Sequence, residues 1–551
     1  MSILSWLPVR PHAMRALAIV TLGALGACTP HAADPPAATT PSDDARLFAQ
    51  AFTAIHQLYI RPVSDRTLVV DGAAHLSALD PNFVARPGPG VGSTATLQLN
   101  YQGQKVGSYV LPGATDAKDS AKFLARVIGV ARQVSPLLAA ASDDVVDHAV
   151  FNGITGGLDR FSRYSPPALA RELRDARDGY GGIGITLDSS NDEFLITAVT
   201  PRGPAERVGI RPGDRITAIN GVATARHSRA WVIERLRGAV GSLIQVAVAR
   251  AGGQIHDFRI DRARLVRPTT TVSHDGDILV FHIATFNETT TALVAAAVKQ
   301  AMATPGGRLS GIVLDLRGDP GGLLGQAVSL DDLFIKSGPI IATLGRNPAS
   351  HQYFAATGHA IARNLPIVVL INGGSASASE ITAAALQDIG RAVVVGSASY
   401  GKGTVQTALP LVNGGELTIT WARLIAPSGY LLQSHGVVPT VCTSDLANNP
   451  QALDIALQRA QAPASPGFRA ASPRAAVDEA GWEELRRACP ADPASPAVDL
   501  AVAEKLLNDP ALYATALRAL PPATALVRSI PGAPSARSLT RPRAALSSEL
   551  R

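Results

Sequence analysis

The sequence is poor in charge, cysteine and methionine. Only 17% of its 551 residues are charged, and it has three cysteines and three methionines. The formal net charge of +6 is small for this length and no dense basic block occurs, so we expect no nucleic-acid partner. Beyond the N-terminus, no apolar run is long enough for a transmembrane helix. No spacing of His, Cys and carboxylate residues suggests a metal site, and we expect neither metal nor cofactor.

The N-terminus has the pattern of an export signal. Arg10 and Arg15 precede the apolar run "ALAIVTLGALGA", which is too short to span a bilayer. The following "LGAC" resembles a lipobox at the end of the predicted signal segment, residues 1–28, and predicts that Cys28 carries lipid after cleavage in front of it. An ordinary secretory signal is the alternative. We expect a periplasmic protein held by lipid on a bacterial membrane, and Thr29, which is not a retention aspartate, favours the outer membrane.

Two cysteines remain if Cys28 carries lipid. Cys442 and Cys489 form an even pair, which suggests a disulfide in an oxidising compartment. Two free, buried thiols explain the sequence equally well, and both interpretations stay open.

The chain is too long for one core, and its 46% hydrophobic residues indicate several globular domains. Apolar residues at helical spacing in "ARLFAQAFTAIHQLYI" indicate helices near the N-terminus, and "STATLQLNYQGQKVGSYVLP" alternates like a hairpin around "YQGQ". Nothing in that region suggests chemistry. The predicted segments are a signal peptide 1–28, a Pro/Ala-rich tether 29–42, a mostly helical domain 43–177, a β-rich unit 178–265, an α/β unit 266–444, a helical segment 445–520 and a mobile tail 521–551.

The β-rich unit contains two glycine-bearing motifs. "GIRPGDRITAING" fits the Gly-x-x-x-Gly-Asp-x-Ile-x-x-Ile-Asn-Gly run of PDZ domains, and "GGIGI" stands where their carboxylate-binding loop belongs. Successive N–H groups in a glycine-rich turn can hold a carboxylate, and a free strand edge beside them can pair with an extended peptide. The unit therefore resembles a PDZ domain. The resemblance implies that Gly182, Ile183, Gly184 and Ile185 bind the C-terminal tail of a protein or peptide.

The following unit alternates Val/Ile-rich runs with helical segments. The runs "ILVFHIATF", "GIVLDLR", "PIVVLIN" and "RAVVVG" predict a mostly parallel, buried sheet with crossover helices. Active groups in such folds tend to lie on the loops that leave the carboxyl ends of the strands.

One of these loops, "INGGSASASEI", presents three serines, Ser375, Ser377 and Ser379, at the start of a predicted helix. A helix N-terminus offers free N–H donors for a developing oxyanion, but a serine nucleophile also needs a base. No histidine is close in sequence, although a distant one remains possible. We favour Lys402 in "YGKGTVQ", because burial away from acidic groups would neutralise its amine, with Gln406 placed to hold it. The alternative for Lys402 is a solvated surface residue.

These motifs together resemble the carboxyl-terminal processing, or tail-specific, serine peptidases. The shared runs are "GSASASEI", "LQDIGRAVVVG", "GKGTVQ" and the glycine-rich "VLDLRGDPGG". The resemblance implies a crotonase/ClpP-like α/β core in which Ser377 is the nucleophile, Lys402 the general base and Gln406 its orienting partner. It further implies oxyanion donors at the N–H groups of Ala378 and Gly322. The two flanking serines would then shape the loop and cap the helix.

The resemblance spans roughly residues 45–445, with Thr440 standing where the family often has an acidic residue. It predicts a serine endopeptidase whose PDZ domain holds the free C-terminus of a protein or peptide substrate. The sequence is compatible with a homo-oligomer. One alternative is a catalytically silent PDZ adaptor that retains the peptidase fold. Another is an acyl-CoA enzyme of the related crotonase-like fold, a class that seldom carries a PDZ unit.

Overall fold

The computed structural model describes residues 43–113, 115–190, 193–304, 309–362, 364–446, 449, 451–461, 478–492 and 497–518. The predicted signal peptide with Cys28, the predicted tether and the predicted tail lie outside the described residues. Within these ranges, no helix combines the length and apolarity needed to cross a bilayer.

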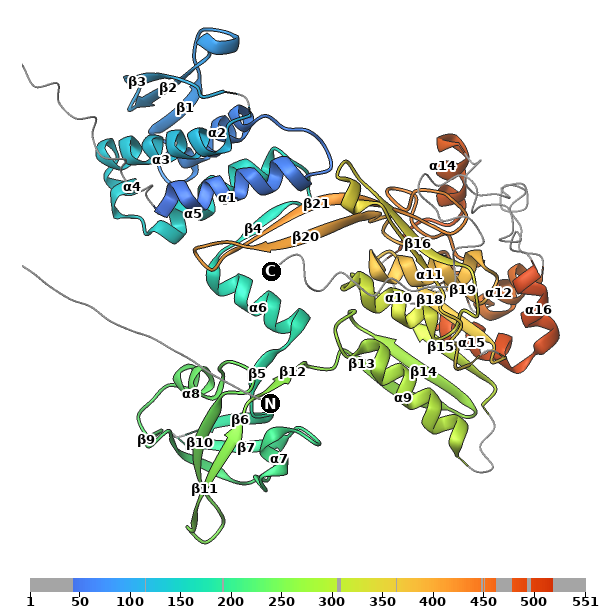
Figure 1. Ribbon diagram of the computed structural model, residues 1–551. Helices are drawn as coiled ribbons and strands as arrows, with labels where there is room; N and C mark the ends of the chain where they lie inside the picture. Colours follow the sequence, from blue (N-terminus) through green and yellow to red (C-terminus); the bar gives the residue numbers. More distant parts are fainter. Residues whose placement is uncertain are drawn as a thin grey trace, which may run out of the picture. The chain divides into compact units, whose positions relative to one another are not determined.

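The N-terminal part packs helices against a three-stranded antiparallel sheet (Figure 1). The predicted hairpin is confirmed: Tyr101 pairs with Gln104 across a two-residue turn. Both turn residues, Gln102 and Gly103, have positive φ, which matches the twist of the flanking strands. The elements are α1 (Asp43–Leu58), α2 (Asp65–Ala74), η1 (His75–Ala78), β1 (Phe83–Pro87), η2 (Gly92–Thr94), β2 (Thr96–Tyr101), β3 (Gln104–Val110), α3 (Ala117–Val134), α4 (Pro136–Ala140), α5 (Asp143–Gly156), β4 (Arg163–Ser165) and α6 (Pro167–Asp178).

The β-rich unit builds its main sheet in the order β11-β10-β8-β7-β6. Among the described strands, β6 is therefore an edge strand of this sheet, with one side free of sheet partners. The elements are β5 (Tyr180–Gly182), β6 (Ile185–Ser190), β7 (Glu193–Val199), α7 (Pro204–Arg207), β8 (Arg215–Ile219), β9 (Val222–Ala223), α8 (Arg229–Leu236), β10 (Leu243–Ala249), β11 (Ile255–Asp261) and β12 (Ala263–Leu265).

The α/β unit contains the predicted buried sheet, with strand order β13-β14-β15-β18-β19-β22. All pairs from β14 to β22 are parallel, and β13 pairs antiparallel with β14. The elements are β13 (Thr270–Asp275), β14 (Ile278–Ile283), α9 (Thr290–Ala303), β15 (Gly311–Asp315), α10 (Leu324–Asp332), β16 (Pro339–Leu344), η3 (Pro348–Ser350), β17 (Gln352–Ala355), β18 (Ile367–Ile371), α11 (Ala378–Asp388), β19 (Val393–Gly396), β20 (Thr404–Pro410), β21 (Glu416–Ile425) and β22 (Val441–Cys442).

The two faces of this sheet belong to two separate hydrophobic cores. In β18, Val369 and Ile371 pack with residues of helices α9, α10 and α11, whereas Val368 and Leu370 pack with residues of α12, α15 and α16. This alternation follows from the two-residue side-chain period of a strand. Because both faces are covered, the strands are apolar throughout, as a parallel sheet requires.

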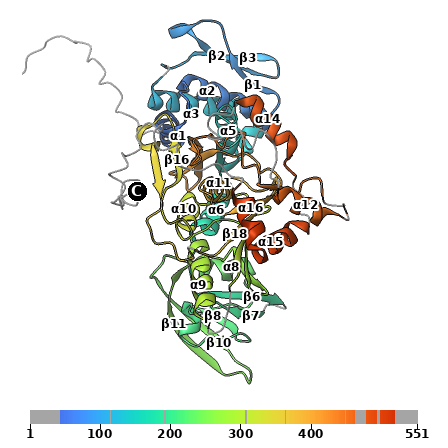
Figure 2. The ribbon, with the colours of Figure 1, turned by 90° about the vertical axis from the view of Figure 1, so that its right-hand side faces the viewer.

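Helices from the C-terminal segment cover the second face. The covering elements are α12 (Ala452–Gln461), α15 (Val498–Asn508) and α16 (Pro510–Arg518), whereas Trp482 and Leu485 of α14 (Glu479–Ala488) pack into the core on the first face. Figure 2 shows α12, α15 and α16 grouped beside the sheet. A disulfide joins Cys442, at the end of β22, to Cys489, just after α14. Of the two states that the sequence left open, the structure therefore contains the disulfide.

A second sheet, ordered β17-β16-β21-β20, joins the N-terminal part to the α/β unit. Strand β4 pairs with β21, and Leu411, Leu417 and Ile419 of the β20–β21 hairpin belong to the same core as the N-terminal helices. The hairpin carries Gln406, so the N-terminal part packs directly on an element of the candidate site.

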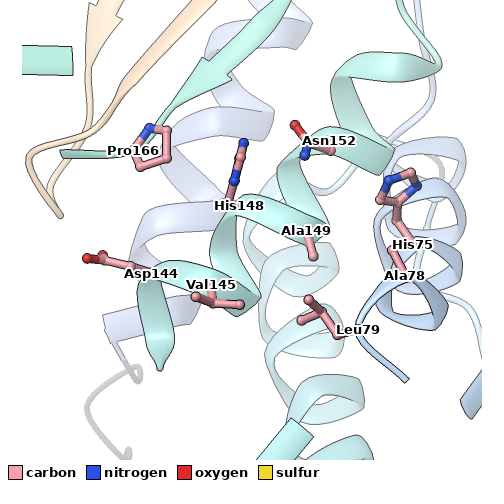
Figure 3. Close-up of a pocket in the computed structure, with 9 residues that line it drawn as sticks. All are labelled: His75, Ala78, Leu79, Asp144, Val145, His148, Ala149, Asn152 and Pro166. Atoms are coloured by element: carbon pink, nitrogen blue, oxygen red, sulfur yellow. The ribbon is translucent and has the colours of Figure 1, made fainter. Parts of the chain in front are cut away.

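A cavity of about 320 Å³ lies among the N-terminal helices (Figure 3). Its lining contains no predicted site residue and consists of His75, Ala78, Leu79, Asp144, Val145, His148, Ala149, Asn152 and Pro166. The candidate site lies elsewhere, on the loops at the carboxyl ends of β15, β18 and β19.

Candidate active site

The three serines of the loop after β18 differ in exposure. Ser375 and Ser379 are fully buried, whereas Ser377 is partly exposed. The Ser375 hydroxyl donates to the carbonyl of Leu316 at 2.7 Å, and the Ser379 hydroxyl donates to the carbonyl of Asp319 at 3.0 Å. The outer two serines thus bind the neighbouring loop, and Ser377 is the serine that a substrate can reach.

Ser377 is the N-cap residue of α11 and has φ 56° and ψ −112°. A non-glycine residue with positive φ is uncommon, and such backbone strain clusters at functional sites. The sequence assigned helix capping to a flanking serine. That assignment is wrong, because Ser379 lies within the first turn of α11 and its hydroxyl binds a different loop.

The buried carboxylate of Glu380 connects the serine loop to the lysine loop. Its Oε2 accepts the N–H of Ser377 at 2.8 Å and the N–H of Lys402 at 2.9 Å. Its Oε1 accepts the N–H of Gly401 at 2.6 Å and the hydroxyl of Ser399 at 2.5 Å. Our sequence interpretation did not include Glu380. The Ser-x-x-Glu spacing of a capping box was the signal that could have identified it.

Lys402 is partly buried between β19 and β20. Burial, followed by the nearby positive charge of Arg163, lowers the pKa of its ammonium, while the charge of Glu380 opposes that shift. Within the described part of the chain, Nζ makes no hydrogen bond to Ser377. It lies 5.3 Å from the centre of the Phe161 ring.

Phe161 comes from the segment between α5 and β4, to which the sequence assigned no chemistry. The Asp159 carboxylate fixes this segment by accepting the N–H of Phe161 at 2.8 Å and the hydroxyl of Thr420 at 3.1 Å. Arg160 stacks on the same ring, with Cζ 4.7 Å from its centre. The N-terminal part therefore supplies a side chain that contacts Lys402, and no local sequence pattern predicts this contact.

Gln406 lies on β20, but the structure does not join it to the lysine amine. Its Nε2 donates to the hydroxyls of Thr404 at 2.9 Å and Thr420 at 3.2 Å. Both acceptors lie in the β20–β21 hairpin. The orienting role that the resemblance implies for Gln406 therefore stays a prediction.

Of the predicted oxyanion donors, Ala378 directly follows Ser377, and Gly322 follows Gly321, the glycine that packs on Ser377. Among the residues that the structure describes, the N–H groups of Ala378 and Gly322 have no intramolecular acceptor. Gly321 packs so closely that a Cβ there would lie 2.8 Å from the Cβ of Ser377. The N–H of Gly321 donates to the carboxylate of Asp319. Burial raises the pKa of this carboxyl group to about 7. The N–H groups of Gly322 and Ala378 are thus free to donate, and their role as oxyanion donors stays a prediction.

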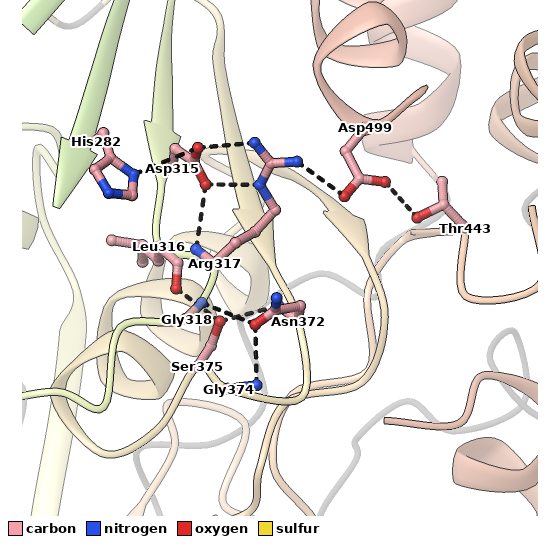
Figure 4. A network of polar contacts seen from close by, with 10 residues as sticks. All are labelled: His282, Asp315, Leu316, Arg317, Gly318, Asn372, Gly374, Ser375, Thr443 and Asp499. Carbon is pink, nitrogen blue, oxygen red and sulfur yellow. Dashed lines mark hydrogen bonds and ion pairs between the residues drawn. The ribbon is translucent and has the colours of Figure 1, made fainter. Parts of the chain in front are cut away.

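A polar network holds the glycine-rich loop against the serine loop (Figure 4). Asn372 Oδ1 accepts the N–H groups of Gly318 and Gly374, both at 2.9 Å. Arg317 forms an ion pair with Asp315 at 2.8 Å and another with Asp499 of α15 at 3.2 Å. Both loops are therefore fixed before substrate arrives, which is the arrangement that electrostatic stabilisation of an oxyanion needs.

The predicted carboxylate-binding loop of the β-rich unit lies between β5 and β6. Gly182 pairs with β12, and the carbonyls of Ile183 and Gly184 accept bonds from the body of the unit. In the described chain, the N–H groups of Ile183 and Gly184 have no intramolecular acceptor. Ile185 begins the edge strand β6 and is packed, partly buried, against the apolar core. Free donors and a free strand edge thus adjoin, as tail binding requires.

The α/β fold, with an accessible serine at the start of α11 and a lysine on the adjoining loop, is typical of a serine hydrolase, and the β-rich unit is a separate peptide-binding unit. Comparison with known proteins agrees: residues 277–443 match the model of peptidase family S41, and residues 172–249 match the PDZ domain model. The carboxy-terminal-processing protease of Bartonella bacilliformis is 36% identical over 325 residues, which cover 58% of this chain and 75% of that protein. The chain therefore belongs to peptidase family S41 and is a carboxy-terminal processing serine protease with a PDZ domain.

The match to a second relative covers a smaller share of that relative's length. The carboxy-terminal processing protease CtpB of Bacillus subtilis is 32% identical over 290 residues, 51% of this chain and 59% of that protein. Among solved structures, the photosystem II D1 C-terminal processing protease is 22% identical over 73% of this chain and 92% of that one, with a TM-score of 0.37.

Proposed function

We propose that this protease cleaves peptide bonds with Ser377 as nucleophile and Lys402 as general base, and with the N–H groups of Ala378 and Gly322 as oxyanion donors. The supporting observation is the carboxylate of Glu380, because one of its oxygens accepts the backbone N–H of both Ser377 and Lys402. The backbones of the accessible serine and of the partly buried lysine are thereby held close together.

The reaction follows from these positions. The Lys402 amine turns from the Phe161 ring to the Ser377 hydroxyl and accepts its proton as Oγ adds to the peptide carbonyl carbon. The free N–H groups stabilise the oxyanion. The C–N bond breaks as the lysine ammonium returns the proton to the leaving amine, which leaves an ester on Ser377. Water, deprotonated by the same amine, then hydrolyses the ester and restores the serine hydroxyl.

Recognition of the tail by the PDZ domain can be tested with one peptide in two forms. We expect amidation of its C-terminal carboxylate to lower kcat/KM by about 10- to 100-fold, because each charge-assisted hydrogen bond contributes about 1.5–3 kcal/mol. Ile183 and Gly184 supply the N–H donors for these bonds. A scrambled interior sequence with a free carboxylate serves as the control for length and charge. Equal rates for the free and amidated tails would refute recognition through the carboxylate.

We further propose that the mature protein is lipid-anchored at Cys28 on the periplasmic side of the membrane, as the lipobox-like "LGAC" predicts. The disulfide between Cys442 and Cys489 supports an oxidising compartment. We expect cells grown with a tritiated fatty acid to label the wild-type protein and to leave a Cys28→Ala variant unlabelled. Label in both proteins, or in neither, would contradict the anchor.

A further inference from the structure

The segment that contains α14 contacts two loops of the active site, although it lies beyond the residues matched by the family model. We call residues 478–492 the C-terminal brace. The carbonyl of Asp492 accepts the N–H of Gly373, in the serine loop, at 2.7 Å. The same carbonyl accepts the hydroxyl of Ser397, in the lysine loop, at 2.9 Å. One residue of the brace thus ties both loops together.

Arg486 of the brace reaches deeper into the lysine loop. Its Nη1 donates to the carbonyl of His435 at 2.6 Å, and both terminal nitrogens donate to the carbonyl of Ser399 at 3.2 Å. The hydroxyl of Ser399 in turn donates to Glu380. A single residue therefore separates Arg486 from the carboxylate that holds the backbone of Ser377 and Lys402.

Arg486 is also a partly buried positive charge close to Glu380. A Cβ on Gly436 would lie 3.1 Å from Arg486 Nη1 and 3.1 Å from Glu380 Oε1, so the two groups approach each other over this glycine. Burial raises the pKa of Glu380 and lowers the pKa of Arg486, and the charge of Glu380 opposes the shift at Arg486. A buried carboxylate without a counter-charge is costly, and Arg486 provides that counter-charge.

The brace is fixed at both ends of α14. Trp482 is buried and stacks on the ring of His435, with centroids 4.8 Å apart and planes inclined by 14°. Cys489 is bonded to Cys442 at the end of β22. Arg486 lies between these two attachments, so its guanidinium is held rigidly against the lysine loop.

We propose that Arg486 is a positioning residue of the active site: it holds Ser399 and Glu380 in place and, through them, the backbone of Ser377 and Lys402. The inference rests on the proposed roles of Ser377 and Lys402. It assigns to the brace a part in turnover rather than in substrate binding, because none of its contacts reaches the PDZ domain within the described residues.

Arg486→Gln in the full, oxidised chain tests the proposal. We expect kcat to fall by about 100-fold with KM unchanged, since a displacement of about 1 Å at reacting groups costs that much. Arg486→Lys keeps the charge but not the two-pronged geometry, and we expect a loss of about 10-fold. The matched control is Arg487→Gln, an exposed arginine on the same helix, which should retain wild-type kcat. Urea unfolding of each variant reports its folding separately.

The outcomes separate the inference from the proposed function. A wild-type protein that an acylating probe fails to label at Ser377 would refute the proposed function. Labelled wild type together with a folded Arg486→Gln variant of unchanged kcat, or of changed KM alone, would overturn the positioning role. If Arg486→Gln does not fold, Arg486→Lys decides: wild-type kcat in that variant rejects the proposal, and reduced kcat at wild-type KM supports it.

Discussion

Ser377→Ala is expected to lower kcat for a tailed substrate by at least about 10⁴-fold, because removal of a nucleophile leaves only binding and oxyanion stabilisation. The fold should persist, since Ser377 is partly exposed and its backbone is held by Glu380. Peptide cleavage followed by mass spectrometry measures the first quantity, and urea unfolding measures the second. The variant should also lose covalent labelling by an acylating probe.

Ser375→Ala is the matched control in the same loop. Its buried hydroxyl donates to the carbonyl of Leu316 and accepts the N–H of Asn372, so its loss should lower the free energy of unfolding by about 1–3 kcal/mol. Probe labelling at Ser377 should continue in this variant. Undiminished cleavage by Ser377→Ala would show that the nucleophile has been misassigned. Loss of probe labelling in Ser375→Ala, with labelling retained in Ser377→Ala, would show the same.

Lys402→Met is expected to lower kcat by about 10²–10⁴-fold, the range for loss of a general base. In the wild type, kcat/KM should rise with pH as the lysine loses its proton. This rise in kcat/KM should occur at a pH below the usual range of lysine pKa values, because burial and the charge of Arg163 lower the pKa of Lys402. A pH profile of both proteins with one peptide measures this. A rising limb that persists in Lys402→Met would assign the titration to another group.

The same substitution should change the pH dependence of stability. The unfolded chain holds the lysine proton up to the ordinary lysine pKa, whereas the folded protein releases it at lower pH. The unfolded state therefore binds more protons between these two pKa values, and wild-type stability should rise with pH across that window relative to Lys402→Met. Taking the difference between the two proteins removes the contributions of other titrating groups.

Much of the candidate site follows from local sequence. The parallel sheet is visible in the Val/Ile runs, and the serine and lysine lie on loops at the carboxyl ends of β18 and β19 because parallel strands place them there. The exposure of the middle serine was not deducible from the triplet. It depends on the outer two binding the loop after β15, a contact between segments distant in sequence.

Three contributors were missed for different reasons. Glu380 had a local signal in its spacing from Ser377. Phe161 and Arg486 had no local signal. Phe161 lies in a turn and Arg486 in an amphipathic helix, and both patterns predict a structural role; only the packing of the folded chain brings them to Lys402 and Ser399. The side-chain bonds of Gln406 likewise depend on Thr420 of a neighbouring strand, which sequence spacing does not reveal.

The cross-link between Cys442 and Cys489 has a practical consequence for making this enzyme. A recombinant chain accumulated in a reducing cytosol keeps both thiols free. In such a preparation, α14 would lack its covalent attachment. The specific activity would then depend on the fraction of molecules in which oxygen had oxidised the two thiols to the disulfide. Counting free thiols before each assay, and secreting the chain during expression, would make rates from different batches comparable.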